Sequence, residues 1–356
     1  MNLSLEGKAF GELPSGEEIK IFTLSLADKI SLSVINYGAT WTHLFLPDAN
    51  GKIQDVLLGF DTLEGFIHEE YQKNYCYIGS TVGRVAGRAT DNKFILDGKT
   101  YLLPPNQGNT HLHGGVEGWD KKVWNYQTEE SQTAIAVHFS YTSPDGEENY
   151  PGKINIKVSY KLDLTGKLSI SYQATSNRKT VLNPTNHFYI NLSGDFTKTI
   201  EGHTFQVNAD KFLPMNDNSL PTGELKPVEE TVFDFRNPKT LNSTIESDDE
   251  QVKIAGGIDH CFVLNKEGEQ AILIDPFSKR RLRLYTTSPG LQVYTSNYLS
   301  GAFKGKRDIA FPKRSAICLE TQFFPDSHNQ AHFPSIVLDK GEVFDSSTSF
   351  IFDCIA

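Results

Sequence analysis

The sequence is poor in cysteine, and its cysteines do not come in close pairs. Cys76, Cys261, Cys318 and Cys354 are spread over 356 residues. No C-x-x-C pair is present, which excludes a zinc ribbon and a thioredoxin-like redox motif. Four thiols in so long a chain do not form a disulfide scaffold. They favour a reducing compartment, and we expect a cytoplasmic protein.

The sequence also lacks an excess of positive charge, a long apolar run and a signal peptide. It has 34 Lys and Arg against 44 Asp and Glu, which gives a net charge of −10. Nucleic acids and anionic membranes bind basic surfaces, so we expect neither as a partner. No stretch approaches the ~18 apolar residues of a membrane helix, and the N-terminus has no basic segment followed by an apolar one.

Helical periodicity is nearly absent as well, and only residues 62–74 could hold a short helix. Alternating βαβ units are thereby excluded, and with them a doubly wound dinucleotide-binding fold. Instead, alternating or β-rich segments follow one another, separated by turn residues such as Asp97-Gly98. These segments are 18–25, 30–46, 93–103, 134–142, 153–164, 167–175, 260–264, 271–275, 281–286, 291–297 and 315–322. Since no linker or repeat divides them, we predict an all-β chain, one large β-sandwich domain over residues 1–356.

The stretch Gly98-Lys99-Thr100 has the end of a phosphate-binding loop without its beginning. The glycine that should stand five residues earlier is missing. The stretch also lies between two short β-rich segments, so we predict a hairpin turn with no role in phosphate binding.

The pair His111 and His113 has the spacing of metal-binding histidines on a strand, with Glu117 further along. A cupin would add a glycine where this chain has Pro105, and a later histidine block that is missing here. We therefore expect no metal site. Two interpretations stay open: surface histidines in a loop, or a histidine that reaches a ligand beside the flexible pair Gly114-Gly115.

Three other segments place polar groups in apolar, strand-like surroundings. We predict a strand over residues 183–192, which carry amides, a hydroxyl and His187. Buried polar groups of this kind either form a network or line a site. Asp259 begins an apolar strand, where it could cap a turn or bind a ligand. Glu320 interrupts a β-rich run. Burial would raise the pKa of its carboxyl and suit it to proton transfer, whereas an amphipathic strand would turn it outward.

Together, and in this order, these segments resemble the aldose epimerase (galactose mutarotase) family. The resemblance spans nearly the whole chain and is carried by residues 36–40, 83–88, 113–115, 183–192, 259–262, 289–298, 319–322, 325–329 and 333–334. It implies a single large β-sandwich. It also implies an isomerase that interconverts the α and β anomers of free aldohexoses such as galactose and glucose, without a cofactor.

The resemblance further implies roles for single residues. His187 matches the general acid and Glu320 the general base. The matching substrate-binding positions are Arg88, His113, Asp259 and Gln292, with Tyr189 added from the motif that holds His187. Many family members have Asn where this chain has Gly87, so a contact made by that amide is lost or replaced here. The candidates for an aromatic side chain that stacks on the sugar are Trp119 and Phe303.

The residues by themselves leave other functions open. A glycoside hydrolase could use Asp259 and Glu320 as its two carboxylates. A non-catalytic carbohydrate-binding domain would need no acid–base pair. A sugar-phosphate epimerase would need basic residues near its pocket, and Lys304, Lys306 and Arg307 are candidates. The preferred sugar and the oligomeric state do not follow from the sequence.

Overall fold

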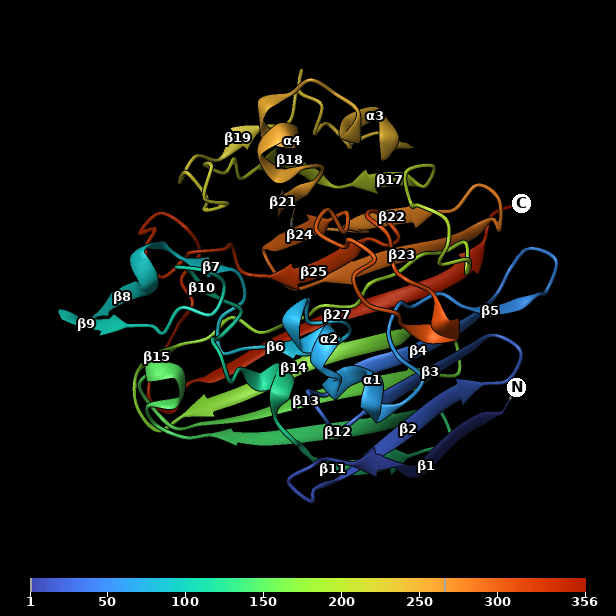
Figure 1. Cartoon of the computed structure of the whole chain (residues 1–356), viewed down its shortest axis with the longest axis horizontal. Coiled ribbons are helices and arrows are strands. Elements are labelled where there is room, and N and C mark those ends of the chain that lie inside the picture. The colour runs from blue at the N-terminus through green and yellow to red at the C-terminus, as the bar shows by residue number, and fades with distance from the viewer. Residues whose placement is uncertain (1, 266) are drawn as a thin grey trace.

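The computed structural model describes residues 2–265 and 267–356 and shows an all-β sandwich (Figure 1). The largest sheet has nine antiparallel strands, several of them eight residues or longer. In spatial order they are β11 (Asn125–Glu130), β12 (Ala134–Ser143), β13 (Ile154–Asp163), β14 (Leu168–Ser176), β27 (Val343–Cys354), β23 (Arg280–Thr286), β22 (Ala271–Ile274), β17 (Thr204–Val207) and β20 (Lys239–Thr240).

Two five-stranded sheets accompany this large sheet. The first is formed by β1 (Leu3–Glu12), β2 (Glu18–Leu26), β3 (Ile30–Ile35), β4 (Thr40–Pro47) and β5 (Ile53–Asp55), in chain order. The second has the order β19 (Lys226–Pro227), β18 (Ala209–Phe212), β21 (Asp259–Leu264), β24 (Gly290–Tyr294) and β25 (Cys318–Gln322). We call this second one the site sheet.

Short ribbons and helices complete the described fold. The ribbons pair β6 (Thr81–Val82) with β16 (Thr185–Asn186), β7 (Arg88–Ala89) with β10 (His111–Leu112), β8 (Lys93–Leu96) with β9 (Lys99–Leu102), and β15 (Thr180–Val181) with β26 (Val337–Leu338). The helices are α1 (Leu63–Ile67), α2 (Glu69–Lys73), α3 (Asn242–Ile245) and α4 (Glu250–Ala255). Across the described residues, no helix has the length and apolar character needed to cross a membrane.

Aromatic side chains join the layers of the sandwich. Trp41 of β4 lies 5.8 Å from Tyr160 of β13 and 5.7 Å from Phe350 of β27, measured between ring centroids. Phe22 of β2 similarly contacts Phe139 of β12 at 6.0 Å. These rings belong to one buried cluster that also includes residues of the site sheet. Burial of apolar area at about 25 cal/mol per Å² is what holds such layers face to face.

Most predicted strands are confirmed, with boundaries shifted by a few residues. The segment 30–46 is divided into β3 and β4 by a turn at Gly38, and 315–322 narrows to β25. The hairpin at Asp97-Gly98 is also confirmed, since both residues have positive φ angles and connect β8 to β9. Gly98-Lys99-Thr100 is therefore a turn and the start of a strand.

Other predictions were wrong or incomplete. Residues 62–74 form two helices, α1 and α2, where one was expected. The segment 183–192 forms only the two-residue strand β16, because its backbone bonds to several different loops and strands. Neither β1 nor β27 was predicted. Serines interrupt the apolar pattern of β27, although this strand lies in the middle of the nine-stranded sheet.

Candidate active site

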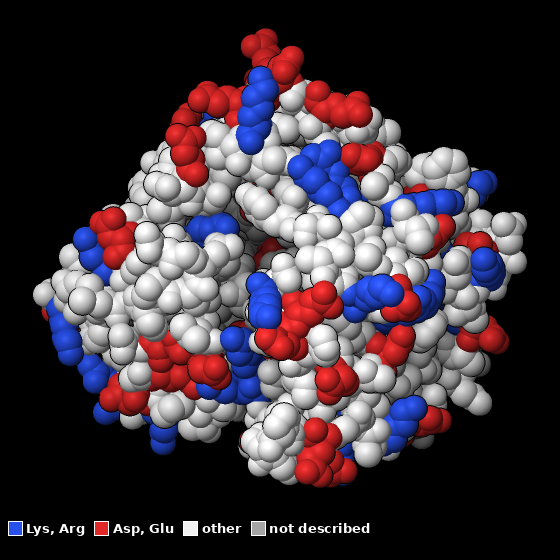
Figure 2. Space-filling view, viewed as in Figure 1, with Lys and Arg blue, Asp and Glu red and all other residues white. Residues whose placement is uncertain are grey.

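A cavity opens between the site sheet, the β7–β10 ribbon and the segment that follows β16. The empty space inside it, with the open mouth included, is about 900 Å³. Figure 2 shows it as a hollow near the centre of the molecular face, surrounded by side chains of both charges. It is lined by all the site residues predicted from the sequence: Arg88, His113, His187, Tyr189, Asp259, Gln292 and Glu320.

Strand alternation places the acidic wall of this cavity. Successive side chains on a strand point to opposite faces of the sheet. Glu320 on β25 lies opposite Gln292 on β24, which lies opposite Cys261 on β21, and all three line the cavity. Their neighbours in sequence, such as Leu291 and Leu319, face the buried cluster on the other side. Glu320 therefore faces inward, and the alternative of a solvent-facing strand residue is wrong.

The β7–β10 ribbon supplies the basic wall. Arg88 begins β7, and its Nη2 donates to Oε1 of Gln107 at 3.0 Å. His113 follows β10 with a φ angle of 51°, outside the strand conformation. The backbone N–H of Gly87 donates to Nδ1 of His113 at 3.3 Å. Because Nδ1 accepts this bond, the neutral ring carries its proton on Nε2.

The two histidines of the H-x-H pair do not share a face, because His113 leaves the strand geometry. The ring of His111 turns away and bonds to the Pro104 carbonyl at 2.7 Å and the Tyr150 hydroxyl at 2.8 Å. Only His113 lines the cavity. Of the two interpretations left open, the structure supports the one in which a histidine beside Gly114-Gly115 reaches a ligand pocket.

The segment that carries His187 is held by its own amides. Asn186 Nδ2 donates to the Gly79 carbonyl at 2.9 Å, and Asn191 Nδ2 donates to the Ser315 carbonyl at 2.8 Å. The backbone N–H of His187 donates to the Ser80 carbonyl at 2.9 Å. Both interpretations of 183–192 are thus correct: the amides form a buried network, and the network positions the imidazole in the cavity wall.

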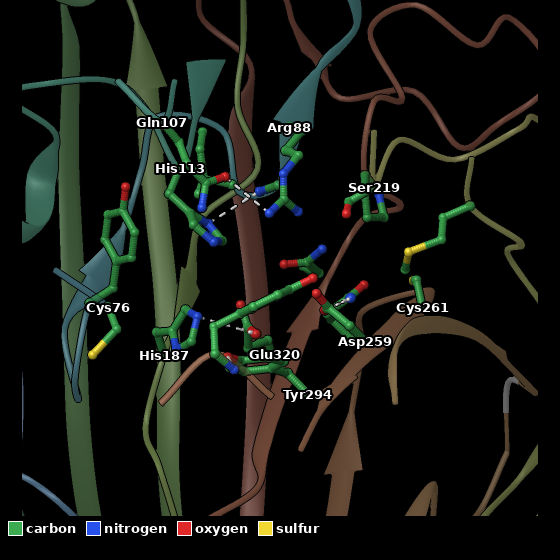
Figure 3. A pocket seen from close by; sticks show the side chains of 18 of the residues that line it. Cys76, Arg88, Gln107, His113, His187, Ser219, Asp259, Cys261, Tyr294 and Glu320 are labelled. Atoms are coloured by element: carbon green, nitrogen blue, oxygen red, sulfur yellow. Dashed lines mark hydrogen bonds and ion pairs between the residues drawn. The ribbon is translucent and has the colours of Figure 1, made fainter. Parts of the chain in front are cut away.

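His187 and Glu320 face each other in the cavity lining, where a dashed line joins them in Figure 3. His187 Nε2 lies 3.6 Å from Glu320 Oε1, and both side chains are buried. Burial lowers the pKa of His187 to about 4. Burial, reinforced by the nearby charge of Asp259, raises the pKa of Glu320 well above its usual value. Burial therefore disfavours the charged form of both groups.

Asp259 lies beside this pair, bonded to the neighbouring strand. Gln292 Nε2 donates to Asp259 Oδ1 at 2.7 Å. Burial raises the pKa of the Asp259 carboxyl, while the positive charge of Arg88 and the bond from Gln292 act in the opposite direction. Of the two roles left open for Asp259, a turn cap or a ligand-binding residue, its position supports the second, because its side chain projects into the pocket (Figure 3).

Tyrosines form the aromatic part of the wall, and the predicted stacking candidates are wrong. Trp119 belongs to the central buried cluster. Phe303 packs in a second cluster against Phe60 and Tyr71. The tyrosines that line the cavity are Tyr75, Tyr77, Tyr189, Tyr294 and Tyr298.

Two of these tyrosine rings stack on the imidazole of His187. Tyr189 stacks on the ring of His187 with centroids 5.1 Å apart, and Tyr77 stacks at 6.0 Å. The hydroxyl of Tyr189 donates to the Cys76 carbonyl at 3.0 Å, so this residue presents its ring, and not its hydroxyl, to the cavity.

His113, His187 and Glu320 also have the residue types of a metal site, with their nearest ligand atoms within 4.8 Å of one another. The bond from Gly87 argues against coordination, because it leaves the proton of His113 on Nε2, the nitrogen that would have to bind the ion. The set is better suited to hydrogen bonding.

The basic residues considered for a phosphate group lie outside the cavity lining. Lys306 is buried in an ion pair with Asp55 at 2.6 Å. Lys304 pairs with Asp308 at 2.8 Å, and Arg307 donates to the Gly194 carbonyl at 3.1 Å. They stabilise loops, so the hypothesis of a phosphate-binding role for them is wrong.

Sequence reasoning also missed residues that line the cavity, among them Gln107, Tyr77 and Gln322. Gln322 could have been found, because it stands two residues after Glu320 on the same strand and so shares its face. Tyr77 and Gln107 lie in loops, where no periodicity indicates direction.

Comparisons with known proteins agree with this geometry. The family model described as aldose 1-epimerase matches residues 20–350. The galactose mutarotases of Sus scrofa and Homo sapiens are each 40% identical to the chain, and each alignment covers 98% of it, with 99% and 98% of the respective relative. The aldose 1-epimerase of Escherichia coli is 32% identical, over 95% of this chain and 96% of the relative.

Solved structures are similar over the same length. Galactose 1-epimerase from Lactobacillus acidophilus NCFM superposes with a TM-score of 0.87 at 28% identity, covering 100% of both chains. The GalM/aldose epimerase homologue from C. elegans gives a TM-score of 0.83 at 30% identity, covering 93% of this chain and 97% of the other.

Proposed function

The chain belongs to the aldose 1-epimerase family and is a mutarotase, and on this premise we propose that His187 and Glu320 are its acid and base. The substrate is a small sugar, and we propose galactose and glucose among the aldoses it accepts. The observation that carries the assignment is the buried pair itself, with 3.6 Å between Nε2 and Oε1 in the cavity lining.

The pair supplies one proton and accepts one, as ring opening requires. A cyclic hemiacetal opens when the C1 hydroxyl loses its proton and the ring oxygen gains one. The aldehyde then rotates about the C1–C2 bond, and closure on its other face gives the other anomer. Glu320 accepts the proton of the C1 hydroxyl, and His187 protonates the ring oxygen. On closure they exchange roles.

The proton count of the free pair supports this mechanism. The pair has two forms with the same number of protons: imidazolium with carboxylate, and imidazole with carboxylic acid. They differ by the transfer of one proton across the 3.6 Å between Nε2 of His187 and Oε1 of Glu320. The free cavity favours the second form, because burial disfavours both charges. Transfer of this shared proton from Glu320 to His187 creates the acid and the base together.

The other polar residues hold the sugar. Arg88 and Asp259 offer charge-assisted hydrogen bonds, which are the stronger kind. His113 presents an Nε2–H donor, fixed by the Gly87 amide. Gln292 keeps its Oε1 free while its Nε2 bonds to Asp259. Tyr189 holds the imidazole in place through ring stacking.

We propose Tyr298 as the aromatic side chain that stacks on the apolar face of the sugar. It is 57% exposed at the cavity and stacks on Tyr294, which is itself buried. A ring that is held in place by Tyr294 and is still exposed can stack on the apolar face of a bound sugar.

Polarimetry on freshly dissolved α-glucose tests the acid–base assignment. Since one positioned proton-transfer group contributes typically about 10²–10⁴-fold, His187→Asn and Glu320→Gln should each reduce kcat by at least about 100-fold. Unchanged mutarotation in either variant would refute it.

A second His–Glu pair provides matched controls. His138 Nε2 lies 3.1 Å from Glu129 Oε2 on β12 and β11, outside the cavity. His138→Asn and Glu129→Gln make the same chemical changes, and they should leave kcat unchanged.

We also propose that residues 1–356 form one domain and that the protein acts in the cytoplasm without a nucleic-acid or membrane partner. One buried cluster running from Phe22 to Phe350 supports the single domain. The four free cysteines support a reducing compartment. The net charge of −10 supports the absence of polyanionic partners.

A further inference from the structure

We infer that Gln322 is a further sugar-binding residue, whose carboxamide accepts a hydrogen bond from a ring hydroxyl other than the one at C1. It thereby contributes to the choice of aldose. This inference rests on the proposed function, since it takes Glu320 as the residue that contacts the C1 hydroxyl.

The register of the site sheet places Gln322 next to the reacting groups. It lies two residues after Glu320 on β25 and opposite Gly290 on β24. Residues i and i+2 of a strand share a face and are separated by about 6.6 Å along it. A hexose ring with its hydroxyls spans such a distance, so a sugar with C1 at Glu320 can present another hydroxyl to Gln322.

The carboxamide oxygen of Gln322 has no partner within the described protein. The side chain is 2% exposed, and Oε1 is buried without a hydrogen bond. Buried polar atoms are nearly always paired, so an unpaired one at a cavity wall indicates a missing donor. Gln292 Oε1 and Glu320 Oε2 are unpaired in the same way on the same wall. A polyol brings hydroxyl donors to all three.

Apolar side chains pack beside Gly290, the residue opposite Gln322 on the neighbouring strand. Cys261 and Phe324 occupy the space in front of Gly290, where an added Cβ would lie 2.9 Å from the sulfur and 3.0 Å from the ring. Both belong to a small buried cluster with Leu213 and Phe333. Among the described residues none hydrogen-bonds to Oε1 of Gln322, and the side chain lines the cavity, so a bound sugar can supply the donor.

The test compares wild type and Gln322→Met on galactose and on its 2-, 3-, 4- and 6-deoxy analogues. Methionine keeps the length of the side chain but cannot accept a strong hydrogen bond. The KM for galactose should rise by about 3- to 10-fold, as expected for the loss of one hydrogen bond. kcat should stay nearly unchanged. For one analogue, which lacks the contacted hydroxyl, the two proteins should have equal KM values.

Gln270→Met is the matched control. Gln270 is equally buried, but its Oε1 accepts from the Thr286 backbone at 2.9 Å, outside the cavity. Its replacement should leave all KM ratios unchanged. Gln322→Leu is a second apolar variant, should Gln322→Met unfold.

The inference is overturned if the Gln322 variants keep the wild-type KM for galactose, or if they raise KM equally for every analogue. Failure of the proposed function would appear elsewhere, as unchanged kcat in Glu320→Gln and His187→Asn.

Discussion

At the scale of the residue, this site depends on side chains that burial has made unusual. Burial lowers the pKa of His187 to about 4 and raises the pKa of Glu320 well above its usual value, so it disfavours the charged form of both groups. Strongly shifted pKa values of this kind are typical of groups that transfer protons in active sites. The His113 tautomer is similarly determined by one backbone N–H.

The first consequence concerns pH. An ordinary histidine becomes protonated below a pKa of about 6.5. Burial lowers the pKa of His187 to about 4, so the pair gains its second proton only at lower pH. We expect kcat/KM to remain constant from pH 7 down to about 5.5, measured by polarimetry in buffers of constant ionic strength. An acid limb near 6.5 would contradict this expectation.

A second residue-scale prediction concerns Gly87. Its φ of +84° is unfavourable for other residues, and an added Cβ would lie 3.1 Å from Cβ of Pro325. Gly87→Ala should therefore destabilise the protein by about 1–2 kcal/mol and raise KM, since the Gly87 amide orients His113. Urea unfolding and polarimetry measure the two effects. Gly202→Ala has no neighbour within 4 Å and should change neither.

At the scale of the element, three adjacent strands of the site sheet act as one wall. Alternation turns Glu320, Gln292 and Cys261 toward the cavity and leaves Leu291, Leu319 and Phe262 in the core. One face of these strands thus lines the cavity, and the opposite face packs in the core. The β7–β10 ribbon and the segment after β16 supply the other walls, so three separate parts of the chain must meet.

Strand β27 shows how the core supports this wall from a distance. Phe350 packs edge-on against Trp41 and Phe188 and is 1% exposed. Phe188 is adjacent to His187 in the chain. Phe350→Ala should cost about 3–5 kcal/mol of unfolding free energy, as large cavities do. Phe277→Ala is the comparison, since Phe277 is 86% exposed. An equal loss in both variants would show that Phe350 does not act through packing.

At the scale of the whole molecule, burial of neutral histidines makes the fold sensitive to acid. His260 is 1% exposed and packs against the rings of Phe212 and Phe233, and burial lowers its pKa to about 3. Its unfolded pKa is about 6.5, so between these values the unfolded state binds a proton that the folded state does not. Stability is therefore complete above about pH 6.5 and falls as the pH decreases toward 3.

The corresponding prediction is a loss of about 2 kcal/mol at pH 5 attributable to His260, from about 1.4 kcal/mol per pH unit over about 1.5 units. Urea unfolding at pH 7 and pH 5 measures it. In His260→Gln, which cannot titrate there, the difference between the two pH values should shrink by this amount. A variant with the full wild-type pH dependence would refute the assignment.

The sequence by itself determined the all-β class and most strands, and it singled out seven residues that line one cavity in the structure. Alternation and turn residues are local, so they can be read along the chain. The ordered motifs then carried the resemblance to a family. The sequence was less informative where the local pattern and the environment disagree. Strand β27 was missed because its serines lie in the middle of a sheet. Residues 183–192 were predicted to form a strand, although their polar network is made with distant loops.

Only the tertiary structure decided which residues meet and what their surroundings do to them. His187 and Glu320 are 133 positions apart, and no local pattern predicts the 3.6 Å between them. Trp119 and Phe303 have aromatic rings that could stack on a sugar, but both pack in buried clusters. The aromatic side chains that line the cavity are tyrosines. Desolvation is a property of three-dimensional packing, so the directions of the pKa shifts of His187 and Glu320 follow from the fold and not from the sequence pattern.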